Sequence, residues 1–134
     1  YEKADRDIVR YGYKASTVPG TVSGLIEAHK NFGKLPLSEV LIPVIRQASQ
    51  GIIVSYDLEQ AIKSSPQLYQ DPESKRIYFR NDKPISEGSL MQRPDLAKSL
   101  EAIASNGEQA FYQGEIAEKF ILAMGSNKGC INIR

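Results

Sequence analysis

Apolar residues recur every three or four positions along most of the chain, which is the spacing of helices with one buried face. The segments that show this pattern are 21–32, 38–50, 55–63, 94–106 and 116–124. Ser38 and Ser55 are placed to cap the second and third segments, and Pro94 suits the first turn of the fourth. Pro43 predicts a kink or a later start in the second helix. Gly24 weakens the first helix by roughly 1 kcal/mol relative to Ala, so we expect a neighbour to approach closely there.

The stretch from Asp71 to Ser89 interrupts the helical pattern. Residues 76–79 have the composition of a strand, residues 81–84 that of a turn, and Ile85 begins a possible return strand. Residues 1–16 show no clear period and are interpreted as an arm or a short strand. The expected fold class is mainly α with a small β excursion. We expect a single helical segment over 1–134, with an arm at 1–16 followed by residues 17–134.

Composition and charge exclude several classes of partner. The chain has 17 Lys and Arg against 16 Asp and Glu, so its net charge of +1 provides no long-range field for nucleic acid or an anionic membrane. No apolar run approaches the roughly 20 residues that span a bilayer. Residues 1–10 lack the apolar core of a signal peptide. The chain starts with Tyr1 and stops at Arg134 without a closing element, so we expect both ends to be internal to a longer polypeptide.

Two residues are candidates for a catalytic or metal-binding role, but a structural role explains each of them better. His29 is the sole histidine and falls on the apolar side of the first predicted helix, which favours a partly buried structural role over that of a base or metal ligand. Cys130 is the sole cysteine and needs a nearby base to act as a nucleophile. A passive small apolar residue is the simpler interpretation of Cys130.

The remaining patterns do not amount to a site. Glu115 and Glu118 are three residues apart on a predicted helix, as are many solvent-facing pairs. The glycines at 12, 20 and 24 lack the spacing of a phosphate-binding loop, and the chain has no G-x-S-x-G motif. We therefore expect no catalytic residue, cofactor site or metal site within the chain. The residues themselves point to a helical scaffold.

Several short motifs occur in a characteristic order. Residues 15–24, Ala-Ser-Thr-Val-Pro-Gly-Thr-Val-Ser-Gly, resemble the A-x-x-V-P-G-x-x-x-G stretch of the γ-glutamyltransferase (γ-glutamyltranspeptidase) family. The motifs that follow in this family are similar to Phe-Gly-Lys-Leu-Pro-Leu at 32–37, Leu-Ile-Pro-Val-Ile-Arg-Gln-Ala at 41–48, Pro-Asp-Leu-Ala-Lys-Ser-Leu at 94–100 and Ala-Phe-Tyr-Gln-Gly at 110–114. Arg93 and the Lys-Gly-Cys at 128–130 depart from the family pattern. The order of the motifs identifies the chain as a segment of such a protein.

The resemblance implies part of an enzyme with the αββα N-terminal nucleophile hydrolase fold. Members of this family cut themselves into a large and a small subunit, and the new N-terminal threonine attacks γ-glutamyl amides such as glutathione. The chain matches the middle of the large subunit, and no residue here matches the substrate arginine, the threonine or the oxyanion glycines. The implied partners are the small subunit and the rest of the large subunit, and the implied location is periplasmic or extracellular. We expect the stripes Leu41/Val44/Ile45 and Leu96/Leu100/Ile103 to be buried against the central sheets.

Two other interpretations remain open. The first is a sibling of the same fold, such as a cephalosporin acylase or a poly-γ-glutamate-processing enzyme. The second is a free-standing helical module that binds a protein partner through an exposed apolar stripe. In each case the isolated chain could self-associate through apolar surface that is meant to be covered.

Overall fold

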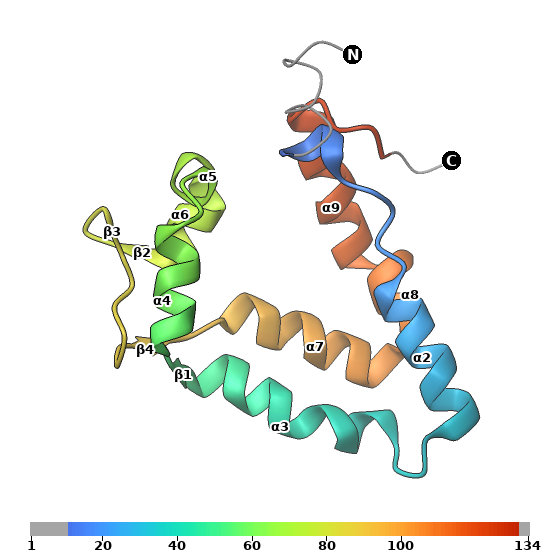
Figure 1. Cartoon of the computed structure of the whole chain (residues 1–134). Helices are drawn as coiled ribbons and strands as arrows, with labels where there is room; N and C mark the ends of the chain where they lie inside the picture. The colour runs from blue at the N-terminus through green and yellow to red at the C-terminus, as the bar shows by residue number, and fades with distance from the viewer. Residues whose placement is uncertain (1–10, 132–134) are drawn as a thin grey trace. The chain divides into compact units, whose positions relative to one another are not determined.

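The computed structural model describes residues 11–131, and the chain within it is mainly helical (Figure 1). The short elements are η1 (Tyr13–Ala15), α5 (Gln67–Gln70), α8 (Glu108–Tyr112), β1 (Ile52–Ile53), β2 (Phe79–Arg80), β3 (Lys83–Pro84) and β4 (Leu90–Met91). The longer helices are α2 (Thr21–Phe32), α3 (Leu37–Gln50), α4 (Tyr56–Lys63), α6 (Pro72–Tyr78), α7 (Pro94–Asn106) and α9 (Glu115–Ser126). The periodic segments of the sequence therefore form helices as predicted. Of the arm or short strand predicted for residues 1–16, residues 1–10 lie outside the described residues, and the described part contains the short 3-10 helix η1 rather than a strand.

The chain divides into two compact units. One contains Tyr1–Val40 and Glu101–Arg134, and the other is Leu41–Leu100. In the first unit, α2 packs beside α8, and α8 packs against α9. Among the described residues of this unit, the buried side chains are Ile26, Ile103 and Met124. Gly107 joins α7 to α8 with φ +61°, a backbone conformation that favours glycine.

The second unit has a small apolar core between α4 and the β excursion. Its buried members are Val54, Ile62, Ile85 and Met91, with Leu58, Leu68, Tyr78 and Phe79 packed against them. Strand β1 pairs antiparallel with β4 through Ile52↔Met91 and Ile53↔Leu90, and β2 pairs antiparallel with β3. The Ser55 side chain accepts a hydrogen bond from the Leu58 N–H at 3.2 Å, which confirms it as the cap of α4. The cap therefore fixes the start of α4, the helix that carries Leu58 and Ile62 into this core.

The predicted strand at 76–79 is wrong for most of its length. Helix α6 covers Pro72–Tyr78, and the strand is restricted to Phe79–Arg80. The helix starts because the Asp71 carboxylate accepts the Ser74 N–H at 2.8 Å and Pro72 occupies the first turn. The predicted turn is confirmed at Asn81 and Asp82, which have φ of +49° and +60°. The return strand expected from Ile85 starts earlier, because Lys83–Pro84 already form β3. Capping thus outweighs the β propensity of Ile77 and Tyr78.

Three further local predictions need correction. Helix α3 starts at Leu37, so Ser38 lies inside the helix rather than at its cap, and Pro43 does not delay the start. Pro43 is the seventh residue of α3, so it removes one hydrogen bond to the Glu39 carbonyl from the helix interior without ending the helix. The alternative expectation, a kink at Pro43, stays a prediction. No atom lies within 4 Å of a Cβ built at Gly24, so the expected close neighbour is absent within the described structure. Gly24 therefore only weakens α2.

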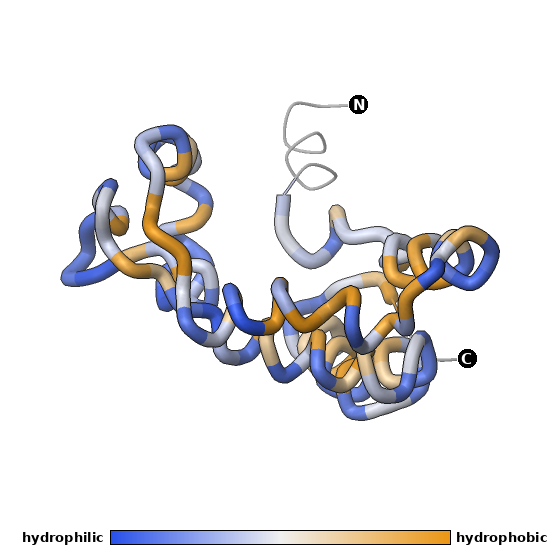
Figure 2. Tube along the Cα trace, turned by 90° about the horizontal axis from the view of Figure 1, so that it is seen from below, coloured by the Kyte–Doolittle hydropathy of each residue, from blue (hydrophilic) through white to orange (hydrophobic). Residues whose placement is uncertain are grey.

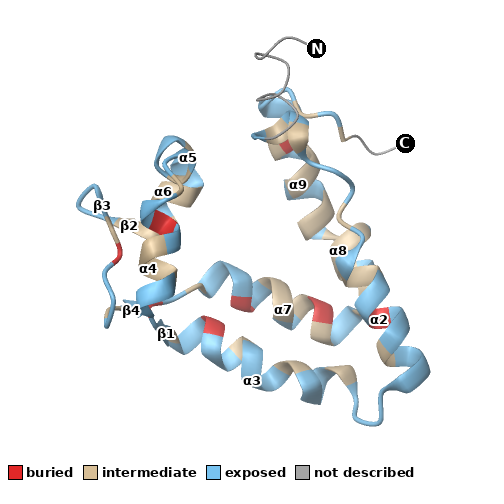
Figure 3. Cartoon of the chain, in the orientation of Figure 1, coloured by how far each residue is buried: buried red, intermediate tan, exposed pale blue. Residues whose placement is uncertain are grey.

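Many apolar side chains remain exposed. Figure 2 colours the Cα trace by residue hydropathy, and Figure 3 colours the chain by how far each residue is buried. In the two predicted stripes, Ile103 is buried and Leu41, Ile45 and Leu100 are half-buried. Val44 and Leu96 are 45% and 39% exposed, so the chain itself does not bury them. Among residues 11–131, none of the helices combines the length and the apolar character that crossing a membrane requires.

Candidate functional site

His29, the first candidate from the sequence, has a structural contact. It lies half-buried on α2, and its Nε2 is 2.8 Å from the carbonyl oxygen of Leu35. A Cβ added at Gly33 would lie 2.6 Å from the His29 ring, so this glycine allows the chain to turn closely around the imidazole. His29 therefore ties the end of α2 to the segment that leads into α3. This contact agrees with the structural role expected from the sequence.

The other candidates lie on the surface. Cys130 is exposed after α9. Glu115 forms an ion pair with Lys119 at 2.6 Å along one face of α9, and Glu118 is exposed. Within residues 11–131 there is no group of three or more His, Cys, Asp and Glu side chains that could hold a metal ion. The features that distinguish this chain are instead the contacts between its motifs.

In the first unit, the Val-Pro-Gly motif contacts the Ala-Phe-Tyr motif. The Tyr112 hydroxyl donates a hydrogen bond to the Pro19 carbonyl at 2.6 Å and accepts one from the Ser23 N–H at 3.1 Å. The Ser23 hydroxyl donates to Glu108 at 3.1 Å. An apolar cavity of about 220 Å³ lies beside this contact, between Val18–Pro19, α8 and α9. Two motifs about ninety residues apart in sequence therefore form one structural joint.

Replacing Tyr112 by Phe tests this joint. The variant leaves the Pro19 carbonyl and the Ser23 N–H without their partner, so we expect the free energy of unfolding of the chain to fall by about 1–2 kcal/mol. Urea denaturation followed by circular dichroism measures the change. The matched control is Tyr56→Phe, because Tyr56 is 59% exposed, and its effect should stay within about 0.5 kcal/mol. Equal effects at both positions would show that the Tyr112 hydroxyl does not hold the joint.

In the second unit, the end of α3, where the Leu-Ile-Pro motif finishes, contacts the two residues that precede the Pro-Asp-Leu-Ala motif. The Arg93 N–H donates to the Ala48 carbonyl at 2.8 Å, and the Gln92 amide donates to the carbonyls of Ser49 and Gln50 at 3.4 and 3.3 Å. Gly51 ends α3 with φ +100°. Beside this contact lies a cavity of about 200 Å³, which we call the α3–α7 groove, lined by Val44, Gln47, Ala48, Ile52, Met91, Arg93 and Leu96.

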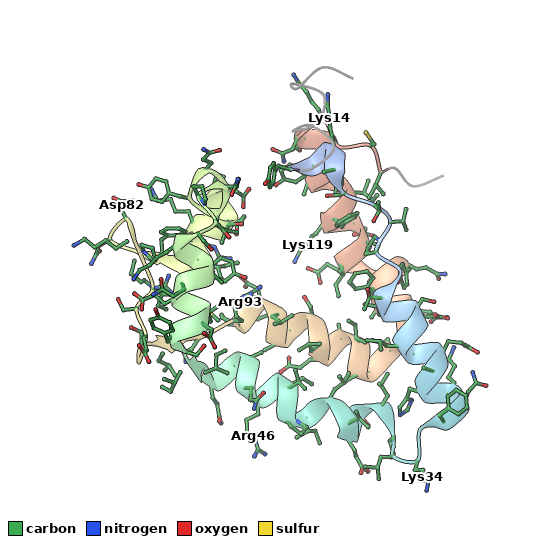
Figure 4. The ribbon with its side chains drawn as sticks, viewed as in Figure 1. Lys14, Lys34, Arg46, Asp82, Arg93 and Lys119 are labelled. Atoms are coloured by element: carbon green, nitrogen blue, oxygen red, sulfur yellow. The ribbon has the colours of Figure 1, made fainter. Side chains whose placement is uncertain are left out.

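Ion pairs hold the polar side of the second unit. Asp95 accepts a hydrogen bond from the Arg76 guanidinium at 2.7 Å, and this bond lowers the pKa of the Asp95 carboxyl. Asp82, at the tip of the β2–β3 hairpin (Figure 4), pairs with Lys75 at 2.6 Å and accepts the Tyr69 hydroxyl at 3.0 Å. The hydrogen bond from Lys75, followed by that from Tyr69, lowers the pKa of Asp82. These pairs are exposed, so each contributes little to stability.

The lowered pKa values determine how the stability of the fold changes as the pH falls. A carboxyl whose folded pKa lies below its unfolded value of about 3.9 stabilises the fold above that value and loses this contribution as the pH falls through the folded pKa. Between about pH 5 and about pH 2, we therefore expect the Asp95→Asn variant to lose less of its free energy of unfolding than the unmodified chain. Thermal unfolding at several pH values checks this. An unchanged pH profile would show that the Arg76–Asp95 pair is not maintained in solution.

Comparison with known proteins places these motifs in a family. The model of the gamma-glutamyltranspeptidase family matches residues 1–134. A glutathione hydrolase proenzyme of Pseudomonas aeruginosa is 42% identical over 120 residues, which cover 90% of this chain and 21% of the relative. The acylase ACY 1 proenzyme of Pseudomonas sp. strain SE83 is 36% identical over 122 residues, covering 90% of this chain and 22% of the relative. The chain thus spans about a fifth of the length of these curated relatives.

Solved structures confirm the fold class. The crystal structure of Helicobacter pylori gamma-glutamyltranspeptidase matches with a TM-score of 0.91 and 33% identity, covering 94% of this chain and 37% of that chain. The match agrees with the predicted helical part of an N-terminal nucleophile hydrolase fold. The ordered motifs, their pairwise contacts and these matches agree: the chain belongs to the gamma-glutamyltranspeptidase family.

Proposed function

We propose that the chain is a structural part of a γ-glutamyltransferase that hydrolyses or transfers γ-glutamyl groups. The nucleophile is the N-terminal threonine of the small subunit, which lies outside residues 1–134. This chain supplies no catalytic, cofactor-binding or metal-binding residue, and its role is to form the helical flank that packs against the central sheets. The observation that carries the proposal is the family match over residues 1–134, together with 42% identity to a glutathione hydrolase proenzyme.

The chemistry of the described residues supports a structural role. His29 contacts a backbone carbonyl, and Glu115 pairs with a lysine of its own helix. The motifs contact each other through backbone and hydroxyl groups, and such contacts position helices. The partners of the chain are the remainder of the large subunit and the small subunit. The enzyme is located in the periplasm or outside the cell, and cell fractionation followed by the activity assay tests this location.

The full-length gene product provides the test of this function. We expect it to appear as two subunits on a denaturing gel and to release p-nitroaniline from γ-glutamyl-p-nitroanilide. The double variant His29→Ala, Cys130→Ala should keep its turnover number within about threefold of the unmodified enzyme, since neither residue takes part in chemistry. A loss of about a hundredfold or more in a variant that still folds and processes would place one of them in the active site.

A sibling activity is the second candidate, and the 36% identity to an acylase proenzyme favours it. Such an enzyme would share the nucleophile but prefer a cephalosporin side-chain amide over a γ-glutamyl amide. Comparing kcat/KM for the two substrates in the full-length enzyme separates the candidates. Higher kcat/KM for the γ-glutamyl substrate supports the first, and the reverse ratio supports the acylase.

A further inference from the structure

The α3–α7 groove has the properties of an interior surface, although it is open in this chain. Its floor is formed by Ala48 and Met91, both buried. Its rim carries Val44, Ile52 and Leu96, which are 45%, 41% and 39% exposed. Three large aliphatic side chains around one hollow are costly to leave in water, at roughly 25 cal/mol for each Å² of apolar surface. Their grouping therefore indicates a surface that another segment covers.

The groove has one cationic end. Arg93 lines it and is half-buried just before α7, where Figure 4 labels it. The Arg93 N–H is used by the Ala48 carbonyl. Among residues 11–131 the Arg93 guanidinium forms no ion pair within 4 Å. The neighbouring Asp95 already has Arg76 as its ion-pair partner, and the hydrogen bond from Arg76 lowers the pKa of Asp95 more than the charge of Arg93 does. A guanidinium that becomes covered together with an apolar groove needs a carboxylate or carbonyl partner. A cover for this groove therefore has to bring an acceptor to one end.

The comparisons show how much polypeptide is available to supply the cover. This chain matches 37% of the solved Helicobacter pylori chain and about a fifth of the curated proenzymes. Val44 and Leu96 belong to the two family-like motifs on α3 and α7, whereas the neighbouring Ala48 and Ala97 are buried within the chain. The two helices thus bury the small residues Ala48 and Ala97, whereas the larger Val44 and Leu96 of the same motifs stay exposed.

We propose that the α3–α7 groove is the docking site for an amphipathic segment of the same enzyme outside residues 1–134. The segment inserts one large apolar side chain between Val44, Ile52 and Leu96, and it places a carboxylate opposite Arg93. This inference rests on the proposed function, because it requires that the chain be part of a longer enzyme. It adds the position of the contact and the chemistry of the segment that makes it.

Cysteine labelling of the full-length enzyme tests the proposal. In a Cys130→Ser background, a maleimide is applied to Leu96→Cys and to the control Lys98→Cys, an exposed position on the same helix. Mass spectrometry of the peptide that contains the new cysteine measures the rate. Relative to the enzyme in urea, we expect Leu96→Cys to react at least about tenfold more slowly in the folded enzyme and Lys98→Cys to change by less than about threefold. Leu96→Cys reacting as fast as Lys98→Cys would overturn the proposal.

The charge at the end of the groove is tested separately. Adding Arg93→Glu to Leu96→Cys should raise the labelling rate in the folded enzyme several-fold, whereas Arg93→Lys should leave it within about twofold. Identical labelling rates for the Arg93→Glu and Arg93→Lys variants would overturn the proposal that a carboxylate pairs with Arg93. Turnover of γ-glutamyl-p-nitroanilide by the same preparations keeps the two proposals distinguishable. An active enzyme with a reactive Cys at 96 refutes the groove contact alone, and a protected Cys at 96 in an enzyme without this activity refutes the function alone.

Discussion

Replacing Ile62 by Ala is expected to destabilise the chain by about 3 kcal/mol. Ile62 is 2% exposed and lies in the core with Val54, Ile85 and Met91. Removing three methyl or methylene groups costs their transfer from water and leaves a cavity that the surrounding helices and strands fill only partly. Urea denaturation followed by circular dichroism at 222 nm gives the change in the free energy of unfolding.

The matched control for Ile62→Ala is the same substitution at Ile53. Ile53 is 64% exposed on β1, so its side chain gains little from burial within the chain. We expect Ile53→Ala to change the free energy of unfolding by less than about 0.5 kcal/mol. If both variants lose the same stability, the core between α4 and the β excursion is not the one described here.

Gly51→Ala is expected to cost about 1–3 kcal/mol. Gly51 ends α3 with φ +100°, which an L-residue with a Cβ rarely adopts. The added Cβ would also lie 2.8 Å from Leu90 Cδ1 and 2.9 Å from Gln92 Cγ. Leu90 Cδ1 can move aside, but Gln92 Cγ lies close to its own backbone, so the steric contact adds to the backbone strain. Thermal unfolding and urea denaturation measure it.

The same substitution at Gly24 should have the opposite sign. Gly24 lies inside α2, and a Cβ there would meet no atom within 4 Å. Ala is a better helix former than Gly by roughly 1 kcal/mol, so Gly24→Ala should stabilise the chain by up to that amount. Destabilisation by Gly24→Ala would indicate that a segment outside the described residues approaches α2 at this point, as the sequence had suggested.

The periodic helices were predictable from sequence, and the reason lies in local physics. Ser55 caps α4, Pro94 opens α7, and Gly107 separates α7 from α8, each at a position where its conformational preference fits. The failure at α6 has the same origin. Asp71 and Pro72 form a strong helix start, but the aromatic and β-branched residues that follow have the composition of a strand.

The contacts that define the candidate site could not be read from one sequence. The hydrogen bond from Tyr112 to Pro19 joins residues 93 positions apart, and nothing in the local pattern of either motif specifies the other. Periodicity likewise marked Val44 and Leu96 as apolar stripe positions without showing that the chain leaves both exposed. The burial of these two side chains depends on polypeptide outside this chain, which the periodicity of this chain cannot reveal. The family resemblance supplied the order of the motifs, and the structure supplied their pairing.

The most direct test of the structural role compares the 134-residue chain with the full-length gene product in one assay. Both are incubated with γ-glutamyl-p-nitroanilide at equal molar concentration, and release of p-nitroaniline is followed. We expect turnover by the full-length enzyme and none above background by the chain alone. Turnover by the chain alone that survives replacement of His29 and Cys130 would contradict it, because residues 1–134 would then contain an active site.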